Sequence, residues 1–264
     1  MTLEEIRYSM LIFSMTLPRF FGVFILLPIL NKQVLGASLI RNGVICSLAI
    51  CLFPAIKDIT LVKDLHDVEL VLVLAKEVLL GVLISFMLAI PFWAIEAVGF
   101  FIDNQRGATL ASSINPVLGQ QSSPTGILMT QTLVTLFFVS GAFMGLIQAL
   151  YASFIYWPIG TFFPIIGDGW VDFFYSQIEV VLDLLAVMSA PVIVAMFFSE
   201  FGLALVSRFA PQLNVFSLAM PVKSGVASFM LIVYIVILME GFLDKLWELL
   251  FFKDLLQPII GGGI

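Results

Sequence analysis

The sequence predicts an all-α, polytopic membrane protein, on the strength of three observations. Of its 264 residues, 61% are hydrophobic and 11% are charged, whereas soluble domains average roughly 45–50% apolar and about 25% charged residues. The mean hydropathy is +1.13, which leaves too little polar surface to cover a water-soluble globule. The apolar residues are gathered into long runs, which is the pattern of membrane-spanning helices.

Six apolar runs are candidate transmembrane helices, each longer than the roughly 20 residues needed to cross a bilayer core. They cover residues 8–30, 37–56, 68–102, 126–157, 177–209 and 222–251. Prolines inside several runs, such as Pro91 and Pro191, remove backbone donors and are expected to kink their helices. Several runs are long enough to tilt, to bend or to project beyond the bilayer.

The connections between the runs suggest how the helices are paired. The stretch WPIGTFFPIIGDGW, residues 157–170, predicts a loop with a short interfacial element, because prolines and glycines punctuate it. Pro211 and Pro221 bracket QLNVFSLAM, which is too short to span and predicts the bend of a helical hairpin or a re-entrant piece. We expect one structural unit, with N-terminal helices and a loop over 1–125 and helical hairpins over 126–264. Cationic residues divide evenly between the two sides, so charge assigns no orientation.

Several functional classes find no support in the sequence. The N-terminus is acidic before it is basic, which does not fit a cleaved secretory signal. The net charge of -6 argues against nucleic-acid binding. Cys46 and Cys51 lie within one apolar run and are expected to be small core residues rather than metal ligands or a disulfide. No motif of a metalloprotease, a P-loop enzyme or a serine hydrolase is present, so we expect neither an enzyme nor a cofactor.

Ionisable residues interrupt the apolar runs, and each is costly at a bilayer centre if it faces lipid, roughly 2.5–3.5 kcal/mol on insertion scales. They are Arg19, Lys76, Glu77, Glu96, Asp183 and Glu200. Each must face a partner, water or another subunit, although Lys76 and Glu77, early in their run, could instead reach the interface from a helix end. Arg208 lies about 12 Å along a helix from Glu200, too far for a direct pair without a bend. A stand-alone secondary transporter that uses these carboxylates is one alternative.

The polar stretch GFFIDNQRGATLASSINPVLGQQSSPTG, residues 99–126, is longer than a simple turn requires. Its serines have no neighbouring base and are expected to be solvated, so a polar loop without a specific role is one interpretation. The other is a loop that folds back among helices and closes a pore, since irregular backbone is tolerated at membrane depth where protein buries it. Arg106 could then be satisfied by Asp103, Asn104 and Gln105, while Gly107 permits an unusual turn. Elsewhere, Gly141 and Gly145 form a small-xxx-small pair suited to close helix packing.

Two segments carry a resemblance to a known family. They are PFWAIEAVGFFIDNQRGAT, residues 91–109, and SEFGLALVSRFAPQLNVFSLAMPVKSG, residues 199–225. Together they resemble the SctT (SpaR/YscT) family of the type III secretion export apparatus, whose flagellar counterpart is FliR. The IDNQRG form is similar to the injectisome branch. Similarity in length and in the spacing of apolar runs covers nearly the whole chain.

The resemblance implies a non-enzymatic subunit of a helical export gate in the bacterial inner membrane, within the secretion basal body. SctR and SctS subunits would form the gate with this chain, SctU and SctV would lie nearby, and unfolded substrate proteins would pass through the pore. It also implies a pore plug and a hairpin bend with subunit contacts. The plug residues would be Asp103, Asn104, Gln105, Arg106, Gly107, Ala108, Ser112, Ser113, Asn115, Pro116 and Gln121. The bend residues would be Glu200, Arg208, Pro211, Gln212, Asn214 and Lys223.

Overall fold

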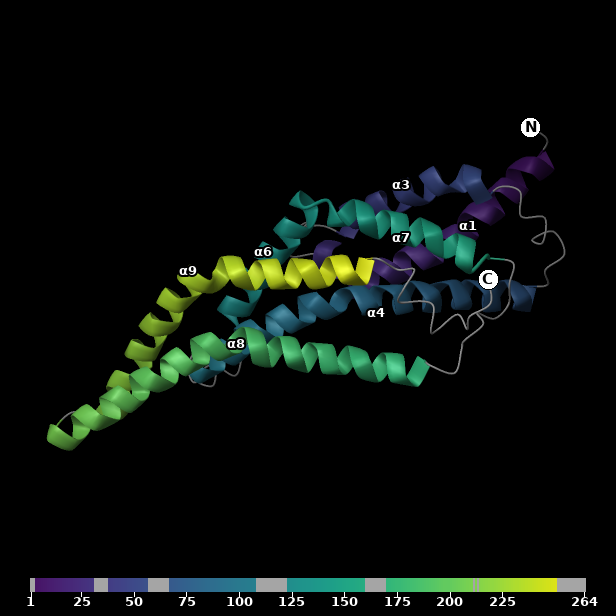
Figure 1. The fold of residues 1–264 in the computed structure, drawn as a ribbon. Coiled ribbons are helices and arrows are strands. Elements are labelled where there is room, and N and C mark those ends of the chain that lie inside the picture. The colour runs from purple at the N-terminus through teal and green to yellow at the C-terminus, as the bar shows by residue number, and fades with distance from the viewer. Residues whose placement is uncertain are drawn as a thin grey trace. The chain divides into compact units, whose positions relative to one another are not determined.

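A computed structural model describes residues 3–30, 38–56, 67–107, 123–159, 170–210, 212 and 214–250, and this part of the chain is helical without a strand (Figure 1). The predicted all-α class is therefore confirmed. The helices are α1 (Leu3–Leu26), α3 (Ser38–Ile56), α4 (Asp67–Gln105), α6 (Pro124–Val139), α7 (Ala142–Tyr156), α8 (Trp170–Phe209) and α9 (Val215–Leu250). A short 3-10 helix, η1 (Pro28–Leu30), follows α1.

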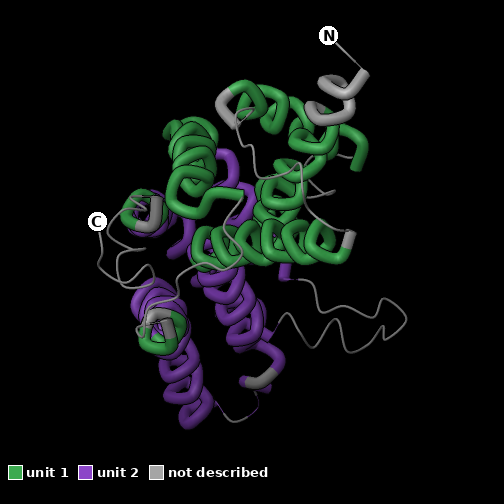
Figure 2. Tube along the Cα trace, turned by 90° about the vertical axis from the view of Figure 1, so that its right-hand side faces the viewer, with its two compact units in different colours: residues 1–90, 137–175, 246–264 green, residues 91–136, 176–245 purple. Residues whose placement is uncertain are grey.

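The chain forms two compact units, shown in different colours in Figure 2. Unit 1 comprises residues 1–90, 137–175 and 246–264, and unit 2 comprises residues 91–136 and 176–245. The long helix α4 contributes its first part to unit 1 and its second part to unit 2. The division falls at Pro91, which lies inside the helix. The predicted division of the chain near residue 125 does not match these units.

Fewer helices than predicted are long enough to span a bilayer. Within the described ranges, three qualify by length and composition, namely Val68–Gln105, Phe174–Phe209 and Ser217–Glu248. The first predicted run is shorter as a helix, because α1 ends at Leu26, two residues before Pro28, and its apolar part is only Met10–Leu26. A proline disfavours helical backbone in the residue that precedes it, which explains this end. The apolar part of α3 is similarly short, Ser38–Pro54.

The fourth predicted run is broken in two. Helices α6 and α7 meet at a bend of 73°, and Gly141, the residue before α7, has a φ of 80°. Glycine adopts this left-handed conformation without the steric cost that other residues meet. No described atom lies within 4 Å of a Cβ built at Gly141, so no described helix packs closely against this residue, and its packing role stays a prediction. The amide of Gly145 donates to the carbonyl of Gly141, and its packing role stays a prediction.

Helices α8 and α9 form the predicted hairpin, with its turn between residues 210 and 214. The bend is narrower than the sequence suggested, because α9 begins at Val215 and continues through Pro221. Within unit 2, the hydroxyl of Tyr234 lies 3.9 Å from the Met188 sulfur, so the two helices are neighbours along this stretch. Asn214 caps α9, since its Oδ1 accepts from the amide of Ser217 at 3.4 Å.

Candidate functional site

The predicted plug region begins where α4 ends. The helix stops at Gln105, the amide of Gly107 donates to the carbonyl of Asn104 at 3.1 Å, and Gly107 has a φ of 82°. A glycine in this conformation is a common way to end a helix. The predicted plug residues Ala108, Ser112, Ser113, Asn115, Pro116 and Gln121 lie outside the described residues. The described chain resumes at Ser123, directly before α6.

Asp103 joins these two points of the chain. Its side chain is buried, with only 2% of the residue exposed. One carboxylate oxygen, Oδ2, accepts from the hydroxyl of Ser123 at 2.6 Å and from the amide of Thr125 at 3.0 Å. The other, Oδ1, lies 2.6 Å from Nη2 of Arg106. A buried carboxylate is tolerated only when such partners compensate its charge, and here they come from both ends of the segment.

Arg106 reaches across the same junction. Its Nη2 also donates to Oγ1 of Thr125 at 2.9 Å, so one guanidinium nitrogen contacts α4 and α6 residues together. The side chain is 16% exposed. The prediction that Asp103 satisfies Arg106 is confirmed, whereas Asn104 and Gln105 have exposed side chains. We call the four residues Asp103, Arg106, Ser123 and Thr125 the base clamp.

The start of α6 explains why the clamp residues take these positions. Ser123 precedes the helix, and its hydroxyl accepts from the amide of Gly126 at 2.9 Å, as a helix cap does. The first amides of a helix have no partner within it, and the helix dipole places positive potential there. Asp103 supplies an anion to the amide of Thr125 at this end. The last turn of α4 therefore caps the first turn of α6.

The two helices also touch through their backbones beside the clamp. A Cβ added at Gly99 would lie 2.4 Å from the Cα of Gly126, a distance that no side chain allows. Only glycine permits this approach, which brings the ends of α4 and α6 close enough for the short side chains of Asp103 and Ser123 to meet. The expectation that Ser123 is solvated is wrong, because the residue is buried against Asp103. The signal was available, because Ser-Pro before an apolar run is typical of a helix start.

The predicted hairpin residues are brought together only in part. Glu200 of α8 pairs with Lys223 of α9, with 2.5 Å between Oε2 and Nζ. Half of the Glu200 side chain is exposed, 51%, against 17% for Lys223. Arg208 and Gln212 are exposed at the end of the hairpin, and Pro211 lies outside the described residues. Glu200 thus takes its cation from the opposite helix rather than from Arg208.

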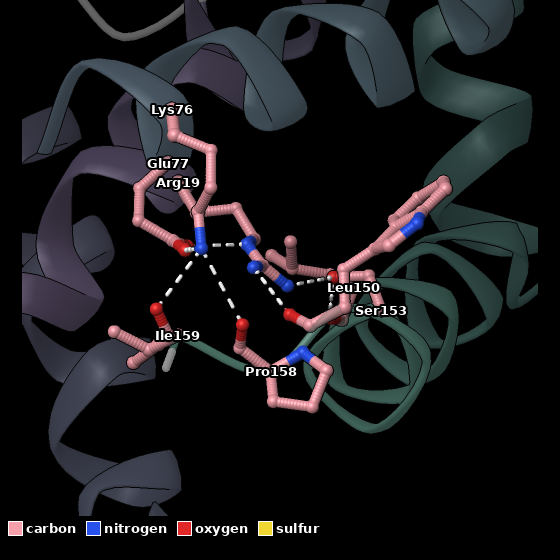
Figure 3. Close-up of polar contacts among 8 residues, drawn as sticks. Arg19, Lys76, Glu77, Leu150, Ser153, Pro158 and Ile159 are labelled. Atoms are coloured by element: carbon pink, nitrogen blue, oxygen red, sulfur yellow. Dashed lines mark hydrogen bonds and ion pairs between the residues drawn. The ribbon is translucent and has the colours of Figure 1, made fainter. Parts of the chain in front are cut away.

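A second polar cluster lies in unit 1, where Arg19, Lys76 and Glu77 meet (Figure 3). Arg19 and Glu77 are both fully buried, at 0% exposed, and Nε of Arg19 lies 2.7 Å from Oε2 of Glu77. The remaining donors of Arg19 bond Oγ of Ser153 at 3.1 Å and the carbonyl of Trp157 at 2.7 Å. Arg19 therefore has the partner that the sequence analysis required of it.

Lys76 completes this cluster from the same helix as Glu77. Its Nζ lies 2.8 Å from Oε1 of Glu77 and donates to the carbonyl of Ile159 at 3.0 Å. The alternative that Lys76 and Glu77 reach out to the interface is wrong for Glu77, since its side chain is fully buried and pairs with Arg19 of α1. The cluster links three helices of unit 1, because α1, α4 and the end of α7 each contribute to it.

The remaining ionisable and sulfur-containing residues that the structure describes add no candidate metal site. Glu96 and Asp183 are exposed, and the described ranges contain no group of three or more His, Cys, Asp or Glu side chains that could hold a metal. Cys46 and Cys51 are free; Cys51 is exposed, so its predicted place in the core is wrong. The described residues thus offer a helix-joining clamp and a buried ion pair.

An all-α fold with three described helices long and apolar enough to cross a bilayer defines the class of an integral membrane protein. The chain belongs to the family of bacterial export proteins, family 1, whose sequence pattern matches residues 10–249. It is 50% identical to the Yop proteins translocation protein T of Yersinia pestis over 89% of each chain. Its identity is 31% to the secretion system apparatus protein SsaT of Salmonella typhimurium, over 84% of this chain and 85% of that one.

A flagellar relative also matches most of the chain. The flagellar biosynthetic protein FliR of Bacillus subtilis is 32% identical over 84% of this chain and 85% of its own length. These relationships confirm the predicted SctT (SpaR/YscT) family. The protein is a membrane component of a type III secretion export apparatus, and it is not an enzyme.

Proposed function

We propose that this chain is a core subunit of the export gate and forms a central pore for unfolded substrate proteins together with SctR and SctS family subunits. SctU and SctV family proteins lie nearby, and the gate sits in the bacterial inner membrane within the secretion basal body. The segment over residues 106–121 helps to plug the pore at rest. Energy for opening comes from other components of the apparatus.

The observation that carries this proposal is the apolar surface of the α8–α9 hairpin, which is longer than a bilayer can cover. Its two apolar helices have 36 and 32 residues, or contour lengths of about 54 and 48 Å at 1.5 Å per residue. A hydrocarbon core of about 30 Å, crossed at a tilt of about 40°, covers only about 39 Å of helix. Part of the hairpin must therefore lie outside the hydrocarbon.

Exposed apolar side chains continue along nearly this whole length. In α8, Ile178 and Phe209 are 58% and 87% exposed, although they lie about 46 Å apart along the helix. The other large exposed side chains of α8 and α9 between positions 182 and 237 are Leu182, Val187, Val194, Phe197, Phe198, Phe201, Leu205, Val206, Leu218, Phe229, Ile232, Val233, Val236 and Ile237. Lipid cannot cover all of them, and water would make such a surface aggregate. Apolar helices of partner subunits supply the cover.

The plug assignment is supported by the base clamp. Both ends of the 108–122 segment are held at one point by Asp103, Arg106, Ser123 and Thr125. A segment fixed at both ends can obstruct a narrow passage without being carried through it. The described site residues need no cofactor to do this.

The test of the gate proposal is the native mass of the tagged protein in mild detergent, with and without co-expressed SctR and SctS family partners. A discrete hetero-complex that includes this chain only when the partners are present is the expected result. A stable monomer or homodimer, indifferent to the partners, would contradict it. That outcome would favour a stand-alone transporter with Glu96, Asp183 and Glu200 as its ion path.

A further inference from the structure

We infer that Asp103 is a positioning residue of the gate. Arg106 is the internal ion-pair partner of Asp103 and not a charge presented to the pore. This inference rests on the proposed function, because it concerns how the two ends of the plug segment are held. It assigns to the base clamp the task of fixing where the segment leaves α4 and where it enters α6.

The first support is the number of bonds that converge on Asp103. Its carboxylate is almost wholly buried and interacts with three groups, two of which come from the chain beyond the segment. Hydrogen bonds to an ionised carboxylate are roughly twice as strong as neutral ones. The residue also caps the α6 N-terminus, where the helix dipole favours an anion. A neutral or displaced side chain at this position weakens all of these interactions together.

The second support is the direction of the Arg106 side chain. The nitrogen Nη2 lies within 2.6 Å of Asp103 and 2.9 Å of the Thr125 hydroxyl. Because Asp103 neutralises its charge locally, Arg106 adds little net potential to any passage nearby. Both contacts come from this terminal nitrogen, Nη2. It lies one bond further from the backbone than the ammonium of a lysine, so a lysine at this position does not reach both partners.

The third support is the length of chain between the clamped residues. Asp103 and Ser123 lie 20 positions apart, and the entropy lost on closing a chain segment grows with its length. The interactions of the clamp and the close approach of Gly99 to Gly126 offset this entropy loss where α4 meets α6. The clamp thus fixes the positions of the two described ends of the segment.

The inference is tested in the assembled complex with partners, by measuring native mass, ion leak in lipid bilayers and the cation-to-anion selectivity of that leak. The variants are Asp103→Asn, Arg106→Lys, Arg106→Gln and Thr125→Val. Gln105→Ala is the matched control, because Gln105 is an exposed neighbour at the end of α4. Thr125→Val removes only the hydroxyl that accepts from Arg106.

The clamp predicts normal native mass, an unchanged selectivity and a raised leak for all four variants. Thr125→Val removes one hydrogen bond to a charged group and should raise the leak about tenfold. Arg106→Lys should leak as much as Arg106→Gln, and Gln105→Ala should match the wild type. A pore charge predicts instead that Arg106→Lys behaves as wild type and that Arg106→Gln alters selectivity. That result would overturn the inference, as would failure of Thr125→Val and Asp103→Asn to assemble.

Deletion of residues 112–121 separates this inference from the proposal on which it rests. The deletion leaves the clamp residues in place, including Ser123. If it produces no leak in the assembled complex, the plug itself is refuted. If it leaks while the four clamp variants remain tight, the plug stands and the positioning role of Asp103 is refuted.

Discussion

Replacing Glu77 with leucine should destabilise the protein strongly, because it leaves the buried Arg19 and the partly buried Lys76 without their anion. Arg19 and Glu77 are both fully buried and 2.7 Å apart, and Lys76 lies 2.8 Å from the other oxygen of Glu77. Removing one partner of a buried ion pair costs about 3–5 kcal/mol. Coulomb attraction at an effective dielectric of about 20 and a charge separation of about 4 Å is similar, about 4 kcal/mol.

The double variant Arg19→Met/Glu77→Leu should recover most of this loss. Apolar side chains of similar volume often replace a buried ion pair at little net cost, whereas Lys76 keeps its carbonyl partners at the end of α7. We expect the double variant to be at least about 2 kcal/mol more stable than Glu77→Leu alone, a coupling within the range of contacting residues.

The assay is equilibrium unfolding of the purified protein in mixed detergent micelles, followed by circular dichroism, for the single and double variants. Glu96→Leu is the matched control, since Glu96 is an exposed carboxylate on the same helix, and it should change stability by about 0.5 kcal/mol or less. A Glu77→Leu protein as stable as this control would refute the reasoning. So would a double variant no more stable than Glu77→Leu.

Three further predictions concern single contacts. Ser123→Ala should lower the free energy of unfolding by about 1–2 kcal/mol through loss of the α6 cap, and it should speed hydrogen exchange of the Gly126 amide. Equal exchange rates at Gly126 in Ser123→Ala and in the exposed control Ser140→Ala would contradict this. Gly141→Ala should cost about 1–2 kcal/mol in unfolding free energy, because alanine is disfavoured at a φ of 80°, and an unchanged unfolding midpoint would show that the bend adapts. Glu200→Gln should cost less than about 1 kcal/mol in the isolated chain, since the pair with Lys223 is half exposed; a clearly larger loss by the same unfolding assay would contradict a weak pair.

The apolar runs predicted the long helices well, but not where helices end. Runs of apolar residues gave α4, α8 and α9 to within several residues, because the prolines inside these helices do not end them. The first run failed as a spanning helix because hydropathy does not register Pro28, which ends the helical backbone after α1. The fourth failed because Gly141 takes a left-handed conformation, which a glycine in a membrane helix does not require. Such choices depend on tertiary packing.

The candidate site was predictable in its residues and not in its pairings. Sequence patterns identified Arg19 and Glu77 as residues in need of partners, since unpaired charges are costly in apolar surroundings. They also predicted that Asp103 could satisfy Arg106. The Arg19 and Glu77 positions are separated by 58 residues, and one sequence contains no information on which distant helix faces meet. The role of Ser123 was obscured for a different reason. Serines in a polar stretch look solvated until the helix that follows them is located.

The most direct test of the gate account asks whether exported chains pass the base clamp. A photo-crosslinking amino acid replaces Gln105 in the assembled apparatus, a secreted protein is stalled in transit, and crosslinked substrate is detected after illumination. The same probe at Ile232, exposed on the α9 surface assigned to partner subunits, is the control. The account predicts substrate crosslinks from position 105 and only partner-subunit crosslinks from position 232. Substrate crosslinks from position 232 with none from position 105 would contradict it.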